Sequence, residues 1–312
     1  MQEQNVLDRL EQRLGRVYVR QRLGIEQDNE DEFARGINFS HPDKWYSIPS
    51  AIRNVLILSG LYRRGLKNAT RVQVRHNDVS IPGLPPLFEG FTILHISDLH
   101  VDLSLGAMES LIELLDTLKY DICVLTGDFR GEIFGPFDVA MQGLARVRCR
   151  LNELVYAVLG NHDSIRMVPE MEEMGIRVLL NEAETLERGD QRIHLAGVDD
   201  AHDYRMDNIE KAASEIPREE CSILLSHSPE IYQQAAHAGF NLCLSGHTHG
   251  GQICLPGAIP ISLSCILPRR MGSGPWTYAH MAGYTSAGVG SCMVSARFNC
   301  PPEITLHRLR QA

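Results

Sequence analysis

The chain has 312 residues, 44% of them hydrophobic and 22% charged, which suits one large globular domain with an appendage and argues against extensive disorder. Its net charge of −9 argues against a dedicated nucleic-acid surface, because affinity for phosphate backbones comes mainly from Lys and Arg. Eight cysteines without CxxC spacing predict buried thiols in a reducing compartment and not a disulfide framework; four of them lie in apolar runs, at Cys123, Cys221, Cys243 and Cys292.

The first 70 residues differ in character from the rest. Apolar side chains recur at helical spacing over residues 6–18, which predicts an amphipathic helix, and an acidic stretch, residues 26–32, follows it. Ser47 and Pro49 mark the start of a second helix, residues 47–67, which carries four basic side chains, Arg53, Arg63, Arg64 and Lys67. We expect this helix either to lie peripherally in a membrane interface or to pack on the core. Its longest uncharged run, residues 55–62, is too short to span a bilayer.

Five apolar runs of strand length follow, and each ends in a polar cluster. The runs are residues 91–97, 121–126, 154–159, 221–226 and 240–245. Such runs predict strands buried on both faces, and amphipathic stretches opening at Ser104 and Pro229 predict helices between them. Ligands in such folds bind beyond the carboxyl ends of the strands, so we expect the clusters to meet at one rim. Glycines 127, 160 and 246 are expected to allow sharp exits from the strands.

The five clusters are weak signals singly and a strong one together. They read Asp98-Leu99-His100, Gly127-Asp128, Gly160-Asn161-His162-Asp163, His227 and Gly246-His247-Thr248-His249. A Gly-Asp pair alone is an ordinary turn, and a single histidine is more often a satisfied loop residue than a ligand. Jointly they supply two Asp, one Asn and four His, a donor set for two divalent ions that share a carboxylate and hydrolyse phosphate esters. Oxygen and nitrogen donors without thiolate favour Mn²⁺ first, with Fe or Zn²⁺ as alternatives.

The order of these clusters resembles the calcineurin-like metallophosphoesterases, whose pattern is D-x-H, G-D, G-N-H-[DE], H and G-H-x-H. The match spans about residues 91–309, and softer features at Asn181, Asp199 and Arg297 resemble the bacterial YaeI/YkuE-like phosphodiesterase branch. That branch is similar in turn to an enzyme that acts on UDP-2,3-diacylglucosamine. The resemblance implies an α/β fold, a four-layer α/β/β/α sandwich of two mixed sheets over residues 85–312, with an N-terminal helical extension over residues 1–70.

The resemblance also implies a role for each matched residue. One ion would be held by Asp98, His100, Asp128 and His249, and the other by Asp128, Asn161, His227 and His247. Asp128 would bridge the two ions, because a carboxylate has two oxygens. His162 would be the general acid that protonates the leaving oxygen, and Asp163 would either orient His162 or cap the following helix. Arg130, two residues after the bridging Asp, could contact a substrate phosphate, but we expect it at the surface.

The implied activity is hydrolysis of a phosphodiester or pyrophosphate bond by a hydroxide held between the ions, on a lipid-linked or UDP-sugar substrate. A nucleotide phosphodiesterase or protein phosphatase is the alternative within enzymes, and a metal-free protein-binding scaffold is the alternative outside them. Filled ligand positions disfavour the scaffold. Many relatives carry an N-terminal transmembrane or twin-arginine segment, whereas Glu3, Asp8 and Glu11 interrupt any signal peptide here. We therefore expect a cytoplasmic location, with membrane contact through residues 47–67 at the inner face.

Overall fold

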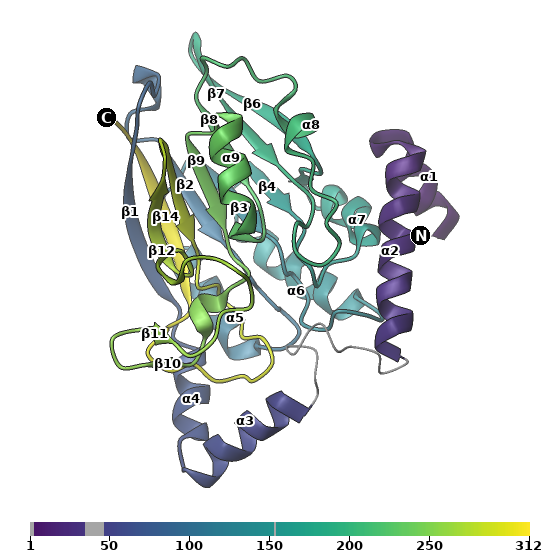
Figure 1. The fold of residues 1–312 in the computed structure, drawn as a ribbon, viewed down its shortest axis with the longest axis vertical. Coiled ribbons are helices and arrows are strands. Elements are labelled where there is room, and N and C mark those ends of the chain that lie inside the picture. Colours follow the sequence, from purple (N-terminus) through teal and green to yellow (C-terminus); the bar gives the residue numbers. More distant parts are fainter. Residues whose placement is uncertain (1–2, 35–46, 153) are drawn as a thin grey trace.

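Two mixed six-stranded sheets face each other in the computed structural model, which describes residues 3–34, 47–152 and 154–312 (Figure 1). The first sheet has the order β1 (Gln73–Ile81), β14 (Glu303–Gln311), β2 (Thr92–Ile96), β3 (Ile122–Thr126), β4 (Val155–Val158) and β5 (Ile176–Val178). The second has the order β12 (Gly274–Tyr278), β13 (Met281–Thr285), β9 (Leu242–Ser245), β8 (Ser222–Leu225), β7 (Gln191–Gly197) and β6 (Glu182–Arg188). A short ribbon of β10 (Cys254–Leu255) and β11 (Ile259–Pro260) lies apart from both.

Helices cover the outer face of each sheet. The first sheet carries α5 (Leu105–Leu115), α6 (Asp138–Arg148) and α7 (Val168–Glu173), and the second carries α8 (Ile209–Ala213) and α9 (Tyr232–Ala238). Side chains alternate across each strand, so Leu94 of β2 packs with α5 while its neighbour Ile93 packs between the sheets, against Ile223 of β8. The resulting layers confirm the predicted α/β/β/α sandwich, and the five apolar runs are its central strands.

Parallel pairing places the strand ends that precede the polar clusters at one edge of each sheet. β2, β3, β4 and β5 run parallel, as do β7, β8, β9 and β13. Because the carboxyl ends of parallel strands meet at the same edge, the loops after β2, β3, β4, β7, β8 and β9 are brought together. β1 pairs with β14 along nine positions, although it precedes residue 85, where the sequence placed the start of the domain. The division of the chain into two units otherwise stays a prediction.

The N-terminal segment forms two helices, α1 (Glu3–Leu14) and α2 (Arg16–Ala34), beside α7 at one edge of the molecule (Figure 1). The prediction of a single helix over residues 6–18 is wrong, since Gly15 has a φ of +91° and divides it into two. The acidic stretch continues α2. Leu10, Leu14 and Val19 join the hydrophobic core of the first sheet. These helices therefore pack on the sandwich.

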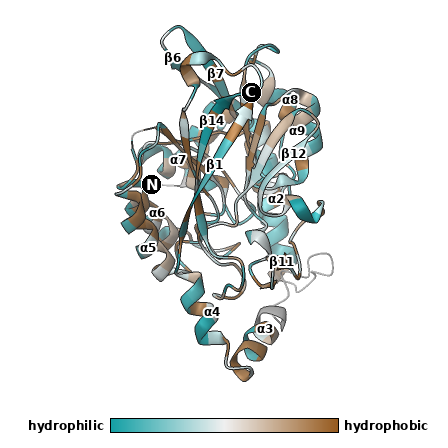
Figure 2. Cartoon of the chain, turned by 90° about the vertical axis from the view of Figure 1, so that its left-hand side faces the viewer, coloured by the Kyte–Doolittle hydropathy of each residue, from teal (hydrophilic) through white to brown (hydrophobic). Residues whose placement is uncertain are grey.

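The predicted helix over residues 47–67 is also two helices, α3 (Ser47–Leu58) and α4 (Tyr62–Ala69). Gly60, with a φ of +73°, turns the chain between them. The pair projects from the body of the molecule, and hydrophobic residues colour the turn between the two helices brown in Figure 2. Its inner face is anchored, because Leu56 packs against Val294 and Ala296. Within the described ranges, we find no helix with the length and apolar content needed to cross a membrane.

Candidate metal centre

The polar clusters after five strands converge at the rim between the two sheets. Backbone hydrogen bonds join neighbouring loops: the Asp98 amide donates to the carbonyl of Gly127 (3.0 Å), and the Gly246 amide donates to that of His227 (2.8 Å). All seven predicted ligand residues are buried there, namely Asp98, His100, Asp128, Asn161, His227, His247 and His249. The expected meeting of the clusters at one rim is confirmed.

The donor atoms form two groups that share Asp128. One nitrogen or carboxylate oxygen from each of four residues lies within 4.8 Å of the others in the first group, which contains Asp98, His100, Asp128 and His249. The second group contains Asp128, His227 and His247 at the same spacing. Asn161 joins the second group, since its Oδ1 lies 3.1 Å from His227 Nε2 and 3.0 Å from His247 Nδ1. The grouping is the one that the resemblance implied.

The imidazoles turn lone pairs toward the centre of each group. His100 Nδ1 and His227 Nδ1 donate to the carbonyls of Arg130 (2.8 Å) and Thr126 (2.7 Å), which fixes the tautomer and leaves Nε2 facing inward. His100 Nε2 then lies 3.2 Å from His249 Nε2. Lone pairs at that separation repel unless a proton or a cation lies between them. The donors therefore fit divalent ions.

Electrostatics favour positive charge at the same place. Burial lowers the pKa of His100, and it holds the pKa of His247 and His249 well below the usual range, so these rings are neutral donors. Burial opposes charge on His227 too, but Asp128 and Asp98 more than offset it and raise its pKa to about 10. The carboxylates thus attract a cation at the shared position. His247 Nε2 is buried and makes no hydrogen bond within the described part of the chain.

Backbone strain concentrates in the ligand loops. Five of the seven predicted ligands have left-handed φ angles: Asp98 (51°), His100 (40°), Asp128 (55°), His247 (68°) and His249 (49°). Each such angle on a residue other than glycine costs about 1–3 kcal/mol and persists only where the surroundings enforce it, typically at functional sites. The strain marks the loops as built for the placement of these side chains.

The glycines of the ligand loops, Gly127, Gly160 and Gly246, are needed for two different reasons. Of the three, only Gly127 has a positive φ, +86°. A Cβ on Gly160 would lie 2.2 Å from Asp128 Oδ1, and one on Gly246 would lie 2.3 Å from Asp98 Oδ2. The expectation of a sharp exit therefore holds for Gly127, while the other two leave room for the carboxylates.

His162 lies beside the centre and in neither ligand group. Its Nδ1 donates to the carbonyl of Gly131 (2.7 Å), and its Nε2 faces Asp128 Oδ2 at 3.9 Å. Arg130, expected at the surface, is only 3% exposed; its guanidinium donates to the carbonyls of His162 and Gly135. The expectation for Arg130 is wrong because its charge satisfies the buried carbonyls of the loop that carries His162.

Asp163 supports the loop of the bridging residue, Asp128, and has neither of its two expected roles. Its carboxylate accepts hydrogen bonds from the amides of Asp128 (2.7 Å), Phe129 (2.9 Å) and Gly160 (2.8 Å). Ser164 caps the following turn by accepting from the amide of Arg166. Asp163 therefore shapes the backbone under Asp128.

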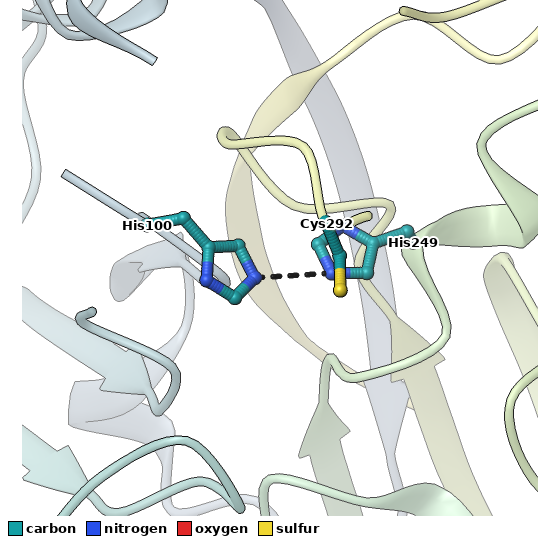
Figure 3. Close-up of side chains that lie close together, drawn as sticks. All are labelled: His100, His249 and Cys292. Carbon is teal, nitrogen blue, oxygen red and sulfur yellow. Dashed lines mark hydrogen bonds between the residues drawn. The ribbon is translucent and has the colours of Figure 1, made fainter. Parts of the chain in front are cut away.

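Asp203 and Cys292 lie at the rim and were not predicted as site residues. Asp203 accepts a hydrogen bond from Asn161 Nδ2 (3.3 Å), which fixes the amide so that Oδ1 faces the histidines. It follows β7, so the rule that ligands lie beyond strand ends could have found it. Cys292, expected to be buried, is partly exposed and lies against His100 and His249 (Figure 3). No spacing signal links it to those histidines.

Comparison with known proteins assigns the chain to a protein family. The profile of the calcineurin-like phosphoesterases matches residues 91–251. Metallophosphoesterase YkoQ of Bacillus subtilis is 29% identical over 78% of this chain and 93% of its own length, and phosphodiesterase YaeI of Escherichia coli is 27% identical over 70% and 82%. A zebrafish (Danio rerio) transmembrane protein with a metallophosphoesterase domain is 28% identical over 85% of this chain, which spans 64% of that protein. Among solved structures, phosphopantetheinyl hydrolase of Mycobacterium tuberculosis aligns at a TM-score of 0.41 and 12% identity, covering 65% of this chain and 91% of that one. The chain belongs to the calcineurin-like phosphoesterase family, and with it to the metal-dependent phosphoesterases.

Proposed function

We propose that the protein is a dinuclear metal-dependent phosphodiesterase or pyrophosphatase. The observation that carries this proposal is the pair of buried donor groups that share Asp128. One ion would be held by Asp98, His100, Asp128 and His249, and the other by Asp128, Asn161, His227 and His247. When bound, the ions supply Lewis acidity that lowers the pKa of water and offsets the negative charge growing on the phosphoryl oxygens. Oxygen and imidazole donors in both groups support Mn²⁺, with Fe and Zn²⁺ as alternatives.

His162 would be the general acid. Because its Nδ1 hydrogen is engaged by the carbonyl of Gly131, the proton that it can transfer is the one on Nε2, which faces the centre. Arg130 holds the backbone of His162 and so keeps that nitrogen at the rim. Imidazole is the side chain most often used to transfer a proton to a leaving group in enzymes that work near neutral pH.

The α3–α4 pair would bring the site to an amphiphilic substrate at the cytoplasmic face of a membrane. Its outer side exposes four large apolar side chains, of which Leu58 is 87% exposed; the others are Val55, Ile57 and Leu61. Four exposed basic residues flank them, Arg53, Arg63, Arg64 and Lys67, in a chain whose net charge is −9. Apolar side chains with basic neighbours favour an anionic lipid surface. The inner side packs on the core, so both behaviours expected of this segment have support on different faces. A lipid-linked or UDP-sugar phosphate ester is the substrate that we propose.

A substrate panel on the protein loaded with Mn²⁺ tests the proposed function. We expect faster turnover of bis-p-nitrophenyl phosphate and UDP-2,3-diacylglucosamine than of p-nitrophenyl phosphate, because the site is proposed for diesters and pyrophosphates. Preference for a cyclic nucleotide would point instead to a nucleotide phosphodiesterase. No bound ions and no turnover of any of these would support the metal-free binding scaffold.

A further inference from the structure

A thiol lies against the first donor group. One ring nitrogen of His100, one of His249 and the Sγ of Cys292 all lie within 4.8 Å of one another. Figure 3 shows the sulfur beside the imidazole of His249, with the two histidines joined by their 3.2 Å contact. The predicted donor set contains no sulfur, because Cys292 follows Asp98 by nearly two hundred residues and belongs to no metal motif.

The position of Cys292 is held from two sides. Gln252, three residues after His249, accepts from the amide of Cys292 (3.0 Å) and donates to the carbonyls of Val294 (2.5 Å) and Ala296 (3.2 Å). The segment that presents His249 therefore also holds the loop of the thiol.

The second anchor is α4. The amide of Arg297 donates to the carbonyl of Gly65 (3.1 Å), and Asn68 Nδ2 donates to the carbonyl of Arg297 (3.0 Å). A Cβ on Gly65 would lie 2.7 Å from Ala296 Cβ, so the helix and the loop are in close contact. The thiol thus sits on a braced segment.

We propose that Cys292, His100 and His249 form a sulfur-containing cation site that overlaps the first metal position and takes a thiophilic divalent ion such as Zn²⁺ or Cd²⁺. The inference rests on the proposed function, because it uses two of the same histidines. Thiolate and imidazole donors select Zn²⁺ and softer ions, whereas carboxylate oxygens suit Mn²⁺. Three protein donors with a remaining open position are a usual zinc arrangement.

The consequence is competition between two kinds of metal. An ion held by Cys292 occupies His100 and His249 and leaves the first position only its two carboxylates, Asp98 and Asp128. Zn²⁺ or Cd²⁺ should therefore displace one of two bound Mn²⁺ ions. Binding also releases the thiol proton, since the thiolate is the ligand.

Titration of the metal-stripped, full-length protein with Cd²⁺ alone tests the inference. We expect sulfur-to-cadmium charge-transfer absorption that saturates at one ion per chain and disappears in Cys292→Ser. The affinity for Zn²⁺ should fall at least about tenfold in that variant, since even second-shell substitutions cost 10–100-fold. Cys149→Ser is the matched control, because Cys149 is exposed and outside the rim, and it should leave the absorption unchanged.

Two results would overturn the inference. One is full absorption in Cys292→Ser, and the other is its loss in Cys300→Ser alone, which would place the cadmium at the Cys254 and Cys300 pair in a separate small core cluster. Direct counting of bound Mn²⁺ separates the two proposals. Two Mn²⁺ ions per chain without the cadmium absorption would reject the thiol site alone, whereas a chain that binds none of Mn²⁺, Fe²⁺ and Zn²⁺ would reject the proposed function.

Discussion

Replacement of Arg22 by Met should show how strongly helix α2 supports the metal centre. The Arg22 side chain is completely buried. Its guanidinium pairs with Asp199 (3.1 Å) and Glu26 (2.5 Å), donates to the carbonyl of Asp163 (3.2 Å) and lies 3.4 Å from the centre of the Tyr204 ring. One side chain therefore ties α2 to the loops that follow β4 and β7.

The size of the effect follows from charge burial. Arg22→Met keeps the apolar bulk but leaves the buried carboxylate of Asp199 without its cation, while Glu26 keeps only its pair with Arg166 at 3.3 Å. Removing one partner of a buried ion pair costs about 3–5 kcal/mol of unfolding free energy. Arg20→Met is the matched control on the same helix, because Arg20 is 64% exposed and pairs with Glu11 at 3.5 Å. An exposed pair of that kind is worth about 0–1 kcal/mol.

Urea unfolding followed by circular dichroism measures both variants. We expect a lower midpoint at an unchanged slope for Arg22→Met, and partial recovery in the double variant Arg22→Met/Asp199→Asn, where one unpaired charge is gone. The loop of Asp199 also holds Asp203, which orients Asn161, so Arg22→Met should weaken binding of the second ion. Equal stability of Arg22→Met and Arg20→Met would refute this account of α2.

Three further changes have defined outcomes. His162→Asn should retain both ions and lose ~10²–10⁴ in kcat on substrates with poor leaving groups, but less on p-nitrophenyl esters; equal losses would rule out the acid role. Gly160→Ala should weaken Mn²⁺ binding in calorimetry, because its Cβ would lie 2.2 Å from Asp128 Oδ1. Gly24 is exposed within α2 and has open space around it, so Gly24→Ala should instead stabilise the fold by about 0.5–1 kcal/mol. Weaker Mn²⁺ binding in Gly24→Ala but not in Gly160→Ala would contradict the geometry. Leu58→Glu should reduce co-sedimentation with anionic vesicles and leave turnover of a soluble diester unchanged, while a wild-type protein that stays in the supernatant at low salt would reject membrane contact.

The strands and the donor groups were predictable from sequence for one physical reason. Strands buried on both faces need continuous apolar runs, so the runs ending at residues 97, 126, 159, 226 and 245 stand out against the polar residues that follow them. Parallel pairing then requires those ends to meet. Helical periodicity is less informative about where one helix ends and the next begins. Residues 6–18 and 47–67 keep their apolar spacing across Gly15 and Gly60, and only the positive φ of each glycine reveals two helices.

The supporting residues were not predictable because their partners are distant in the chain. Asp163 was placed correctly in a motif, yet its carboxylate binds two amides of the distant Asp128 loop as well as that of nearby Gly160. Arg130 and Cys292 depend likewise on how loops from different strands fold over one another. Single-sequence patterns record spacing along the chain, and these contacts depend on loop conformation.

Counting the ions in Asp128→Asn tests the central claim most directly. Asp128 is the carboxylate that both donor groups share, so its replacement by a neutral amide should weaken both ions at once. Anomalous scattering from crystals grown with Mn²⁺ should show two ions in the wild-type protein, neither at full occupancy in Asp128→Asn, and only the second reduced in Asn161→Ala. Two fully occupied ions in Asp128→Asn would contradict a shared carboxylate and, with it, the proposed dinuclear centre.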